Sequence, residues 1–307
     1  MTSAKLPPFD IYRGDGTPRP ELAKQMPESG FLFAEQGAYL ADADLVEAVN
    51  VSLAVGQPLL LTGEPGCGKT RLADSLALEL GLGEPLIFQT RSTSQAQELL
   101  YTFDAVGRFH HIQVGDKRAA DPVNYVRYGP LGQAIVEGRR RVVLIDEIDK
   151  APRDFPNDLL SELDRMVFTV HELEEPTCRK AGSHRPVVVI TSNSERQLPL
   201  AFLRRCVFHH IRFPSRERLV AIIGERLRDM NLDGGLVEAA VDRFQEVRGL
   251  SGLVKKPATG ELLAWLTALA IQGKTVDHVR SPALARLPLW QALLKDRDDF
   301  RRLQEAV

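Results

Sequence analysis

The residues of this chain whose types and spacing are best suited to chemistry lie in a glycine-rich stretch. Its members are Gly63, Glu64, Pro65, Gly66, Cys67, Gly68, Lys69 and Thr70. This order fits the phosphate-loop pattern, in which a glycine is followed by any four residues and then by Gly-Lys-Thr. Glycines let the backbone curl so that its N–H groups point inward, where they can bind phosphate oxygens. A helix that begins after such a loop favours negative charge at its N-terminus.

Within this pattern, Lys69 would reach the β- and γ-phosphates of a nucleoside triphosphate, and the Thr70 hydroxyl would ligate Mg²⁺. Arg71, the next residue, is a further candidate for nucleotide binding. The apolar run 59–61 predicts a strand before the loop, and apolar residues at helical spacing over 72–80 predict a helix after it. The alternative is a chance glycine-rich turn, but the strand and helix around the loop favour phosphate binding.

Two adjacent carboxylates, Asp146 and Glu147, follow the apolar run 142–145. A continuous apolar run predicts a strand buried on both faces, and ligands of open parallel sheets bind beyond the carboxyl ends of the strands. Asp146 would therefore hold Mg²⁺, directly or through a water. Glu147 could polarise a water for attack on the γ-phosphate. The alternative is that Glu147 and Asp149 are surface acids that pair with Lys150.

Asn193 and the pair Arg204 and Arg205 are further candidates for such a site. Asn193 ends an apolar strand over 187–193, so its amide could orient the attacking water or contact the γ-phosphate. It could equally be a turn residue. The two arginines precede a last predicted strand, 207–211, and a guanidinium can stabilise charge on transferring phosphoryl oxygens. The two arginines could also be partners in structural ion pairs. If one of them instead projects from the rim of its subunit, it must act on the site of a neighbouring subunit.

The elements that position these residues alternate between strand and helix up to about residue 214. Such alternation implies parallel strands sandwiched between helices. Besides the segments above, the pattern predicts helices over 45–53 and 154–166 and a strand over 85–90. After Pro214 the strand signals end. Helical stretches follow at 216–228, 236–248, 261–271 and 288–303.

Two segments are predicted to be insertions into this alternation of strands and helices. Residues 103–111 are predicted to form a turn-centred hairpin, and residues 167–173 could be one arm of another. The proline-rich residues 1–30 are predicted to form an irregular arm.

The composition narrows the class of protein. The 307 residues are 44% hydrophobic and 26% charged, as is ordinary for a soluble globular protein. A net charge of −2 gives no global electrostatic reason to bind nucleic acid or a membrane surface. No apolar segment approaches transmembrane length, and the N-terminus lacks the apolar core of a signal peptide. The three cysteines are widely spaced, without metal-type pairing, so we expect a cytoplasmic protein and no membrane insertion.

The motifs at 63–70, 146–150, 191–193 and 201–206, in this order, resemble those of an AAA+ ATPase. The likeness is greatest to the MoxR branch, whose members carry hairpin insertions where this chain has residues 103–111 and 167–173. The resemblance covers roughly residues 31–272, and its first two motifs are highly specific.

This resemblance implies a P-loop NTPase core with a parallel sheet between helices, followed by an all-helical lid. It also implies a Walker A loop, a Walker B pair, a sensor at Asn193 and an arginine finger that acts on the neighbouring subunit. Arg205, directly before Cys206, matches the finger position best, with Arg204 as the second candidate. ATP and Mg²⁺ would bind between the subunits of a ring, usually a hexamer. MoxR-like ATPases typically act as chaperones that remodel or mature partners, often with a von Willebrand A domain protein.

The chain departs from the family pattern in the predicted lid. Relatives often have an arginine at the start of a lid helix, where it senses the γ-phosphate. The corresponding segment, 255–261, contains Lys255 and Lys256 but no arginine. A lysine could substitute, although an ammonium lacks the two-pronged geometry of a guanidinium.

We therefore expect an N-terminal arm over 1–30, an AAA+ α/β nucleotide-binding subdomain with insertions over 31–214, and a helical lid over 215–307. The expected function is ATP hydrolysis that remodels a partner protein. One alternative is a nucleic-acid-associated motor, of the clamp-loader or restriction type, for which the chain offers no separate DNA-binding domain. Another is a nucleotide-dependent scaffold that hydrolyses ATP negligibly.

Overall fold

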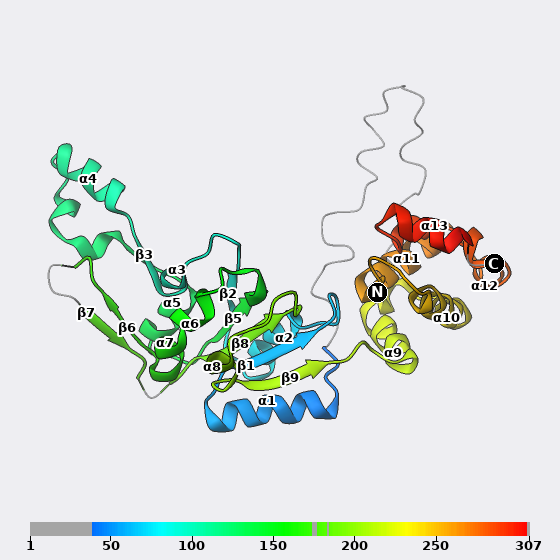
Figure 1. The fold of residues 1–307 in the computed structure, drawn as a ribbon, viewed down its shortest axis with the longest axis horizontal. Helices are drawn as coiled ribbons and strands as arrows, with labels where there is room; N and C mark the ends of the chain where they lie inside the picture. Colours follow the sequence, from blue (N-terminus) through cyan, green and yellow to red (C-terminus); the bar gives the residue numbers. More distant parts are fainter. Residues whose placement is uncertain (1–38, 174–176, 183, 306–307) are drawn as a thin grey trace. The chain divides into compact units, whose positions relative to one another are not determined.

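The computed structural model describes residues 39–173, 177–182 and 184–305. These residues form two compact units, drawn as ribbons in Figure 1. One unit comprises residues 41–213, and the other comprises residues 214–305 together with Tyr39 and Leu40. The predicted N-terminal arm lies outside the described residues. Every helix of the described part of the chain is too short or too polar to cross a membrane.

A parallel sheet of five strands forms the centre of the unit 41–213, in the order β2-β5-β8-β1-β9. The strands are β1 (Leu59–Gly63), β2 (Leu86–Gln89), β5 (Val142–Asp146), β8 (Val187–Ser192) and β9 (Val207–Ile211). Each coincides with a strand expected from the sequence, so the predicted parallel sheet is confirmed. Val189 of β8 lies opposite both Leu59 and Leu144, so β8 lies between β1 and β5. The carboxyl ends of these three strands therefore meet at one edge.

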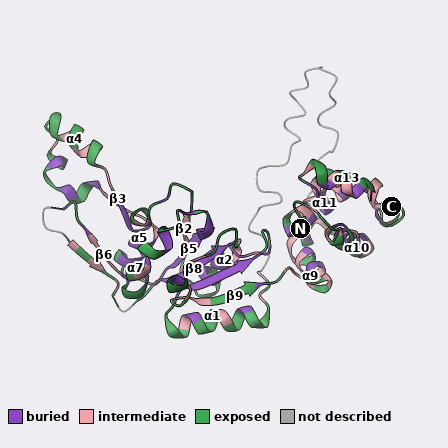
Figure 2. Ribbon diagram, viewed as in Figure 1, coloured by how far each residue is buried: buried purple, intermediate pink, exposed green. Residues whose placement is uncertain are grey.

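The inner strands are buried because their side chains are apolar on both faces. β1, β5 and β8 are buried along their whole length, whereas exposed residues alternate along β2 at the edge (Figure 2). The helices of this unit are α1 (Ala43–Val55), α2 (Arg71–Glu79), α3 (Ala96–Leu100), α4 (Ala105–Gln113), α5 (Pro130–Val136), α6 (Phe155–Asp158), α7 (Leu160–Arg165) and α8 (Leu200–Leu203). α1 packs against β1 and β9, α2 against β5, and α5 against β2 and β5. The helix predicted over 154–166 is interrupted at Leu159, between α6 and α7.

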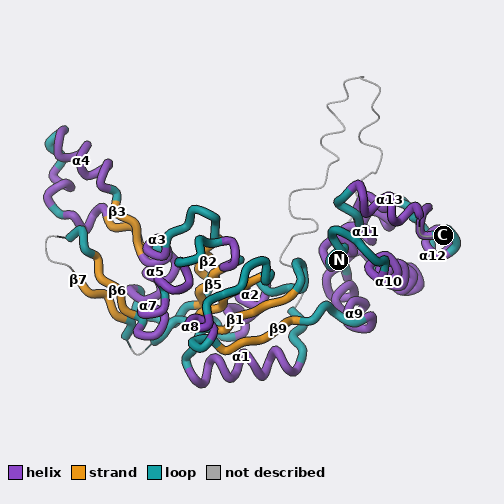
Figure 3. The backbone as a smooth tube through the Cα atoms, in the orientation of Figure 1, coloured by secondary structure: helices purple, strands orange, loops and turns teal. Residues whose placement is uncertain are grey.

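The first insertion is helical, so the hairpin predicted over 103–111 is wrong (Figure 3). β3 (Tyr101–Phe103) instead pairs antiparallel with β4 (Val126–Tyr128), and α4 and two 3₁₀ turns, over 117–120 and 122–125, lie between them. The side chain of Asp104 explains the change from strand to helix. It accepts a hydrogen bond from the backbone N–H of Gly107 at 2.9 Å, which caps the first turn of α4.

The second insertion is a hairpin, as the sequence predicts. β6 (Val167–Val170) pairs antiparallel with β7 (Thr177–Lys180). The two insertions pack together at their bases, where Phe168 stacks on Tyr101 with ring centroids 5.9 Å apart. Arg179 of β7 also donates a hydrogen bond to the hydroxyl of Tyr128.

The unit 214–305 is helical, and no strand occurs among its described residues, as predicted. Its helices are α9 (Arg216–Arg226), α10 (Gly234–Gly249), α11 (Thr259–Ile271), α12 (Val276–Arg280) and α13 (Arg297–Glu305). Trp265 is fully buried and donates from its indole N–H to the carbonyl of Pro288 at 2.8 Å. The helix predicted over 288–303 is wrong in its first half. Asp296 accepts the N–H of Asp298 and so caps α13, which starts later than predicted.

Candidate functional site

The phosphate-loop sequence forms a tight curl between β1 and α2. Gly63, Gly66 and Gly68 all have positive φ, at 148°, 75° and 97°. A Cβ on Gly63 would lie 2.5 Å from the carbonyl oxygen of Ile211 in the neighbouring strand. Only glycine fits this position, because both the φ angle and the approach of β9 exclude a side chain.

Lys69 points back into the curl. Its side chain is buried, and its ammonium donates hydrogen bonds to the carbonyl of Gly63 at 2.7 Å and to that of Glu64 at 3.0 Å. The loop therefore holds a positive charge at its centre. Cys67 is also buried, and burial raises the pKa of its thiol above the ordinary value. Its sulfur thus stays protonated, which fits a packing role in the loop.

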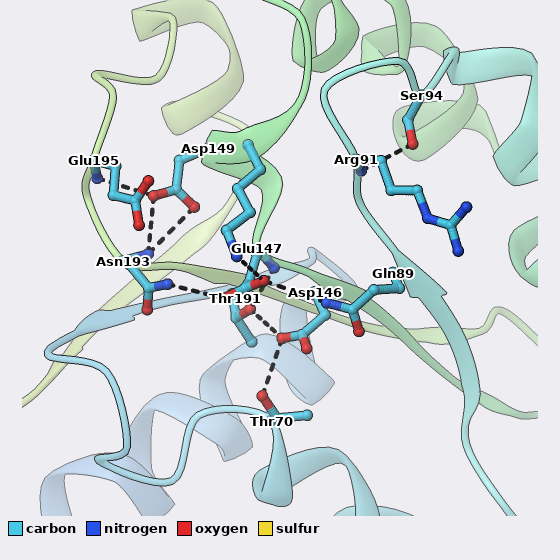
Figure 4. Close-up of polar contacts among 11 residues, drawn as sticks. Thr70, Gln89, Arg91, Ser94, Asp146, Glu147, Asp149, Thr191, Asn193 and Glu195 are labelled. Carbon is cyan, nitrogen blue, oxygen red and sulfur yellow. Dashed lines mark hydrogen bonds and ion pairs between the residues drawn. The ribbon is translucent and has the colours of Figure 1, made fainter. Parts of the chain in front are cut away.

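Asp146, at the end of β5, joins two hydroxyls. It accepts a hydrogen bond from Thr70 at 3.0 Å and one from Thr191, at the end of β8, at 2.6 Å. Thr191 is fully buried, and its hydroxyl oxygen also accepts the backbone N–H of Glu147 at 2.8 Å. Figure 4 shows this chain of contacts across the strand ends. The sequence-predicted residues Thr70 and Asp146 therefore lie together, with Thr191 between the two acidic positions.

Glu147 directs its carboxylate toward three side chains. One oxygen accepts from the Asn193 amide at 3.1 Å, and the other accepts from Lys150 at 2.5 Å and from the Gln89 amide at 3.3 Å (Figure 4). The hydrogen bond to Glu147 is the main reason why the pKa of Lys150 is raised. The backbone of Glu147 is left-handed, with φ at 56°. A non-glycine residue in this conformation is uncommon and frequently marks a functional position.

The alternative in which surface acids pair with Lys150 is thus correct for Glu147, although Lys150 is only one of its three contacts. Asp149 has other partners. It is buried, and its carboxylate accepts backbone N–H groups of residues 193 and 195.

Two residues of this cluster, Thr191 and Gln89, were not among the sequence-predicted site residues. Both are polar and lie at the carboxyl end of a predicted strand, as Asn193 does. The rule that ligands gather at that edge could have identified them. Which strands are neighbours was the missing information, because Gln89 and Thr191 flank β5 from opposite sides.

The two arginine candidates lie apart from this cluster. Arg205 donates to the Asp164 carboxylate at 2.5 Å and to the carbonyl of Ala201 at 3.0 Å. Among the described residues, neither Arg204 nor Arg205 forms a hydrogen bond or ion pair with the phosphate loop or with Glu147. The ion-pair alternative therefore holds for Arg205 within one subunit. Arg71 begins α2 and is half-buried.

The donor set at the strand ends fits Mg²⁺ and a nucleotide phosphate. Thr70 and Asp146 present hard oxygen ligands 3.0 Å apart, which Mg²⁺ prefers together with phosphate oxygens and waters. In the described chain, His, Cys, Asp and Glu nowhere gather in threes to form an all-protein metal site. Mg²⁺ is usually bound without such a cage, through one or two protein ligands and the substrate.

A phosphate loop after β1, an acidic pair at the end of the buried strand β5 and a parallel sheet between helices define a P-loop nucleotide-binding core. Residues 58–206 match the family described as AAA domain (dynein-related subfamily). This match and the similarity to protein NorQ support an AAA+ assignment of the MoxR-like type. An AAA domain implies an ATPase that binds nucleotide with a divalent metal.

Three relatives illustrate the range of similarity. Protein NorQ of Paracoccus denitrificans is 26% identical over 254 residues, which cover 80% of this chain and 85% of NorQ. Chaperone protein ClpB of Chlamydia caviae is 31% identical over 163 residues, 51% of this chain but only 17% of ClpB. The uncharacterized protein YehL of Escherichia coli is 26% identical over 190 residues, 59% of this chain and 50% of YehL. The likeness to ClpB therefore concerns a small part of that protein.

Proposed function

We propose that this protein hydrolyses ATP at the edge of its parallel sheet and uses the reaction to remodel a partner protein. The phosphate loop binds the triphosphate through its backbone N–H groups and through Lys69. Thr70 and Asp146 hold Mg²⁺, which would neutralise phosphate charge when bound. The single observation that carries the proposal is the contact of Glu147 with Asn193 directly beside the Thr70–Asp146 pair.

Glu147 acts as the general base. Its carboxylate lies at the strand edge with one oxygen oriented by Asn193 and the other by Lys150 and Gln89. A carboxylate held in this way can accept a proton from a water that attacks the γ-phosphate. The three contacts fix the direction of this carboxylate.

Measurement of steady-state ATP turnover tests this role. Loss of the base in Glu147→Gln should lower kcat by about 100-fold or more, while ATP still binds. Glu84→Gln is the matched control, because Glu84 is an exposed acid outside the cluster, and it should hydrolyse like the wild type. Lys69→Ala should instead abolish binding of ATP. Equal turnover of wild type and Glu147→Gln would support the nucleotide-dependent scaffold.

We further propose a ring, usually hexameric in this family, in which Arg205 reaches the site of the neighbouring subunit. The support is that Arg205 is 39% exposed and contacts none of the candidate residues of its own subunit among those described. Arg204, which is exposed, is the second candidate.

Mixing two inactive variants tests this arrangement. Arg205→Ala retains Glu147, and Glu147→Gln retains Arg205, so a mixed ring contains some intact pairs of base and finger. ATPase activity should therefore reappear on mixing. If mixing restores nothing while Arg205→Ala alone is inactive, the arginine acts within its own subunit or on folding.

The proposed partner is a protein, in particular one with a von Willebrand A domain. Support comes from the MoxR-like branch, from the similarity to a chaperone protein, and from the first insertion. On α4 of this insertion, three apolar residues are exposed to solvent: Val106 is 81% exposed, Phe109 61% and Ile112 55%. An exposed apolar helix face of this kind suits contact with another protein.

Substitution of this helix face tests the partner proposal. Val106→Asp and Phe109→Asp should leave basal ATP turnover intact and remove its stimulation by the partner, whereas Gln113→Asp, on the same helix, tests charge alone. Stimulation by DNA rather than by a protein would favour the nucleic-acid motor.

A further inference from the structure

Asp149 is a buried acid that accepts hydrogen bonds from a loop distant in sequence. It lies in the 3₁₀ turn Ile148–Lys150 directly after Glu147 and is only 3% exposed. Its carboxylate accepts the backbone N–H of Asn193, at 3.1 and 3.3 Å to the two oxygens, and that of Glu195 at 2.9 Å (Figure 4). Burial of a carboxylate is costly unless such hydrogen bonds satisfy it.

The loop that supplies these N–H groups is held in an unusual conformation at its centre. Ser194, between the two donors, has a left-handed backbone with φ at 62°, and its own N–H is bound by the hydroxyl of Ser192 at 3.0 Å. The N–H groups on either side of Ser194 are therefore the ones that point to Asp149. A left-handed serine is unfavourable by itself, so the loop needs a partner that stabilises it. The Asp149 carboxylate is that partner.

This contact fixes the distance between the two halves of the site. The ladder between β5 and β8 ends at the pair Ile145 and Ile190, and the two strands end shortly after it, at Asp146 and Ser192. Asp149 holds the backbone of residue 193, from which the Asn193 amide reaches Glu147 at 3.1 Å. If the loop moved away from Glu147 by about 1 Å, the distance between the Asn193 amide nitrogen and the Glu147 carboxylate would become too long for a hydrogen bond.

We propose that Asp149 is a positioning residue that holds the loop 193–195 so that Asn193 orients the catalytic Glu147. The inference rests on the proposed ATPase function and adds to it a residue that acts through Asn193. It also explains why the acid is buried while the adjacent Lys150 remains half-exposed.

Two substitutions probe the contact in graded steps. Asp149→Leu has the same branching but no acceptor, so both N–H groups lose their partner. Asp149→Asn keeps one acceptor oxygen but no charge, so it should have an intermediate effect. Asp154→Leu is the matched control, because Asp154 is an exposed acid of the following segment whose side chain caps no helix.

Hydrogen exchange of the backbone amides tests the contact without any need for activity. In Asp149→Leu, the amides of residues 193 and 195 should exchange at least about tenfold faster than in the wild type, whereas the amides of β5 and β8 keep their protection. Asp149→Asn should lie between the two, and Asp154→Leu should match the wild type. Unchanged exchange in both Asp149 variants would overturn the inference.

Steady-state kinetics then test the positioning role. Asp149→Leu should lower kcat at least about tenfold with a KM for ATP within about twofold of the wild type, because only the orientation of the base is lost. In an Asn193→Ala background the same substitution should change kcat by less than about twofold, because the residue acts through Asn193. The positioning role would be overturned if Asp149→Leu lowered kcat in the Asn193→Ala background as much as it does in the wild type. It would also be overturned if kcat were normal although the amides exchange fast.

If Asp149→Leu fails to fold, Asp149→Asn decides by the same criteria. A wild type without ATPase activity would contradict the proposed function instead, and the exchange measurement would still decide whether the contact exists.

Discussion

Replacement of Thr191 by valine should destabilise the protein more than replacement by serine. Thr191 is fully buried at the end of β8, and its hydroxyl joins two groups of β5 and the following loop. It donates to the Asp146 carboxylate at 2.6 Å and accepts the N–H of Glu147 at 2.8 Å. Valine keeps the shape and the β-branch but removes both hydrogen bonds. Serine keeps the hydroxyl and removes one methyl group.

The contacts give the sizes of the two effects. Loss of a hydrogen bond to a charged group costs about 1.5–3 kcal/mol, and an N–H left without an acceptor adds about 1 kcal/mol. Thr191→Val should therefore lower the free energy of unfolding by about 3 kcal/mol. Thr191→Ser loses one buried methyl, worth about 1 kcal/mol. The gap of about 2 kcal/mol corresponds to a difference in Tm of about 4–8 °C for a unit of this size.

Thermal melting followed by circular dichroism, without nucleotide, measures this gap. β-propensity and hydrophobicity alone predict the opposite order, because valine is favoured in buried strands. If Thr191→Val melts at or above the temperature of Thr191→Ser, the hydroxyl contributes nothing and the proposed link between the strand ends is wrong. Thr169→Val is a control, because Thr169 is a half-buried threonine of β6, outside the sheet that carries the site.

Three further predictions concern other groups. Lys150→Met should lower the free energy of unfolding, measured by urea denaturation, by less than about 1 kcal/mol, because its ion pair with Glu147 is partly exposed. A larger loss, restored by Lys150→Arg, would show that the ion pair is a substantial source of stability. Burial alone would raise the pKa of Glu137, but hydrogen bonds from a glutamine and two arginines lower it from 4.5 to about 2. The ionised carboxylate therefore stabilises the folded state above pH 4.5, and this contribution is lost as the pH falls toward 2. The gap in urea midpoint between wild type and Glu137→Gln should accordingly shrink over that pH range, and a constant gap would contradict the assignment. Iodoacetamide at pH 8 should label the exposed Cys178 and not Cys206, because burial raises the pKa of the Cys206 thiol to about 12; mass spectrometry of peptides distinguishes the two.

Local sequence patterns predicted the central sheet well. Each apolar run became a strand because a segment that is apolar on both faces is stable only between other layers of the protein. The glycines of the phosphate loop were equally informative, since their positive φ angles are required by the curl itself. The predictions that failed, the hairpin over 103–111 and the helix from 288, lie where one capping aspartate changes the local structure. An aspartate at such a position is common in turns as well as at helix starts, so its effect was not evident from the sequence.

The sequence by itself determined the phosphate loop, the acidic pair and the strands that carry them, because each depends on neighbours within a few residues. The tertiary structure alone decided which polar residues meet at the sheet edge. Asp146, Thr191 and Gln89 come together because β5 lies between β2 and β8, an order that no local pattern reveals. The role of Asp149 likewise emerged only from the fold, because its partners lie 44 and 46 residues further along the chain.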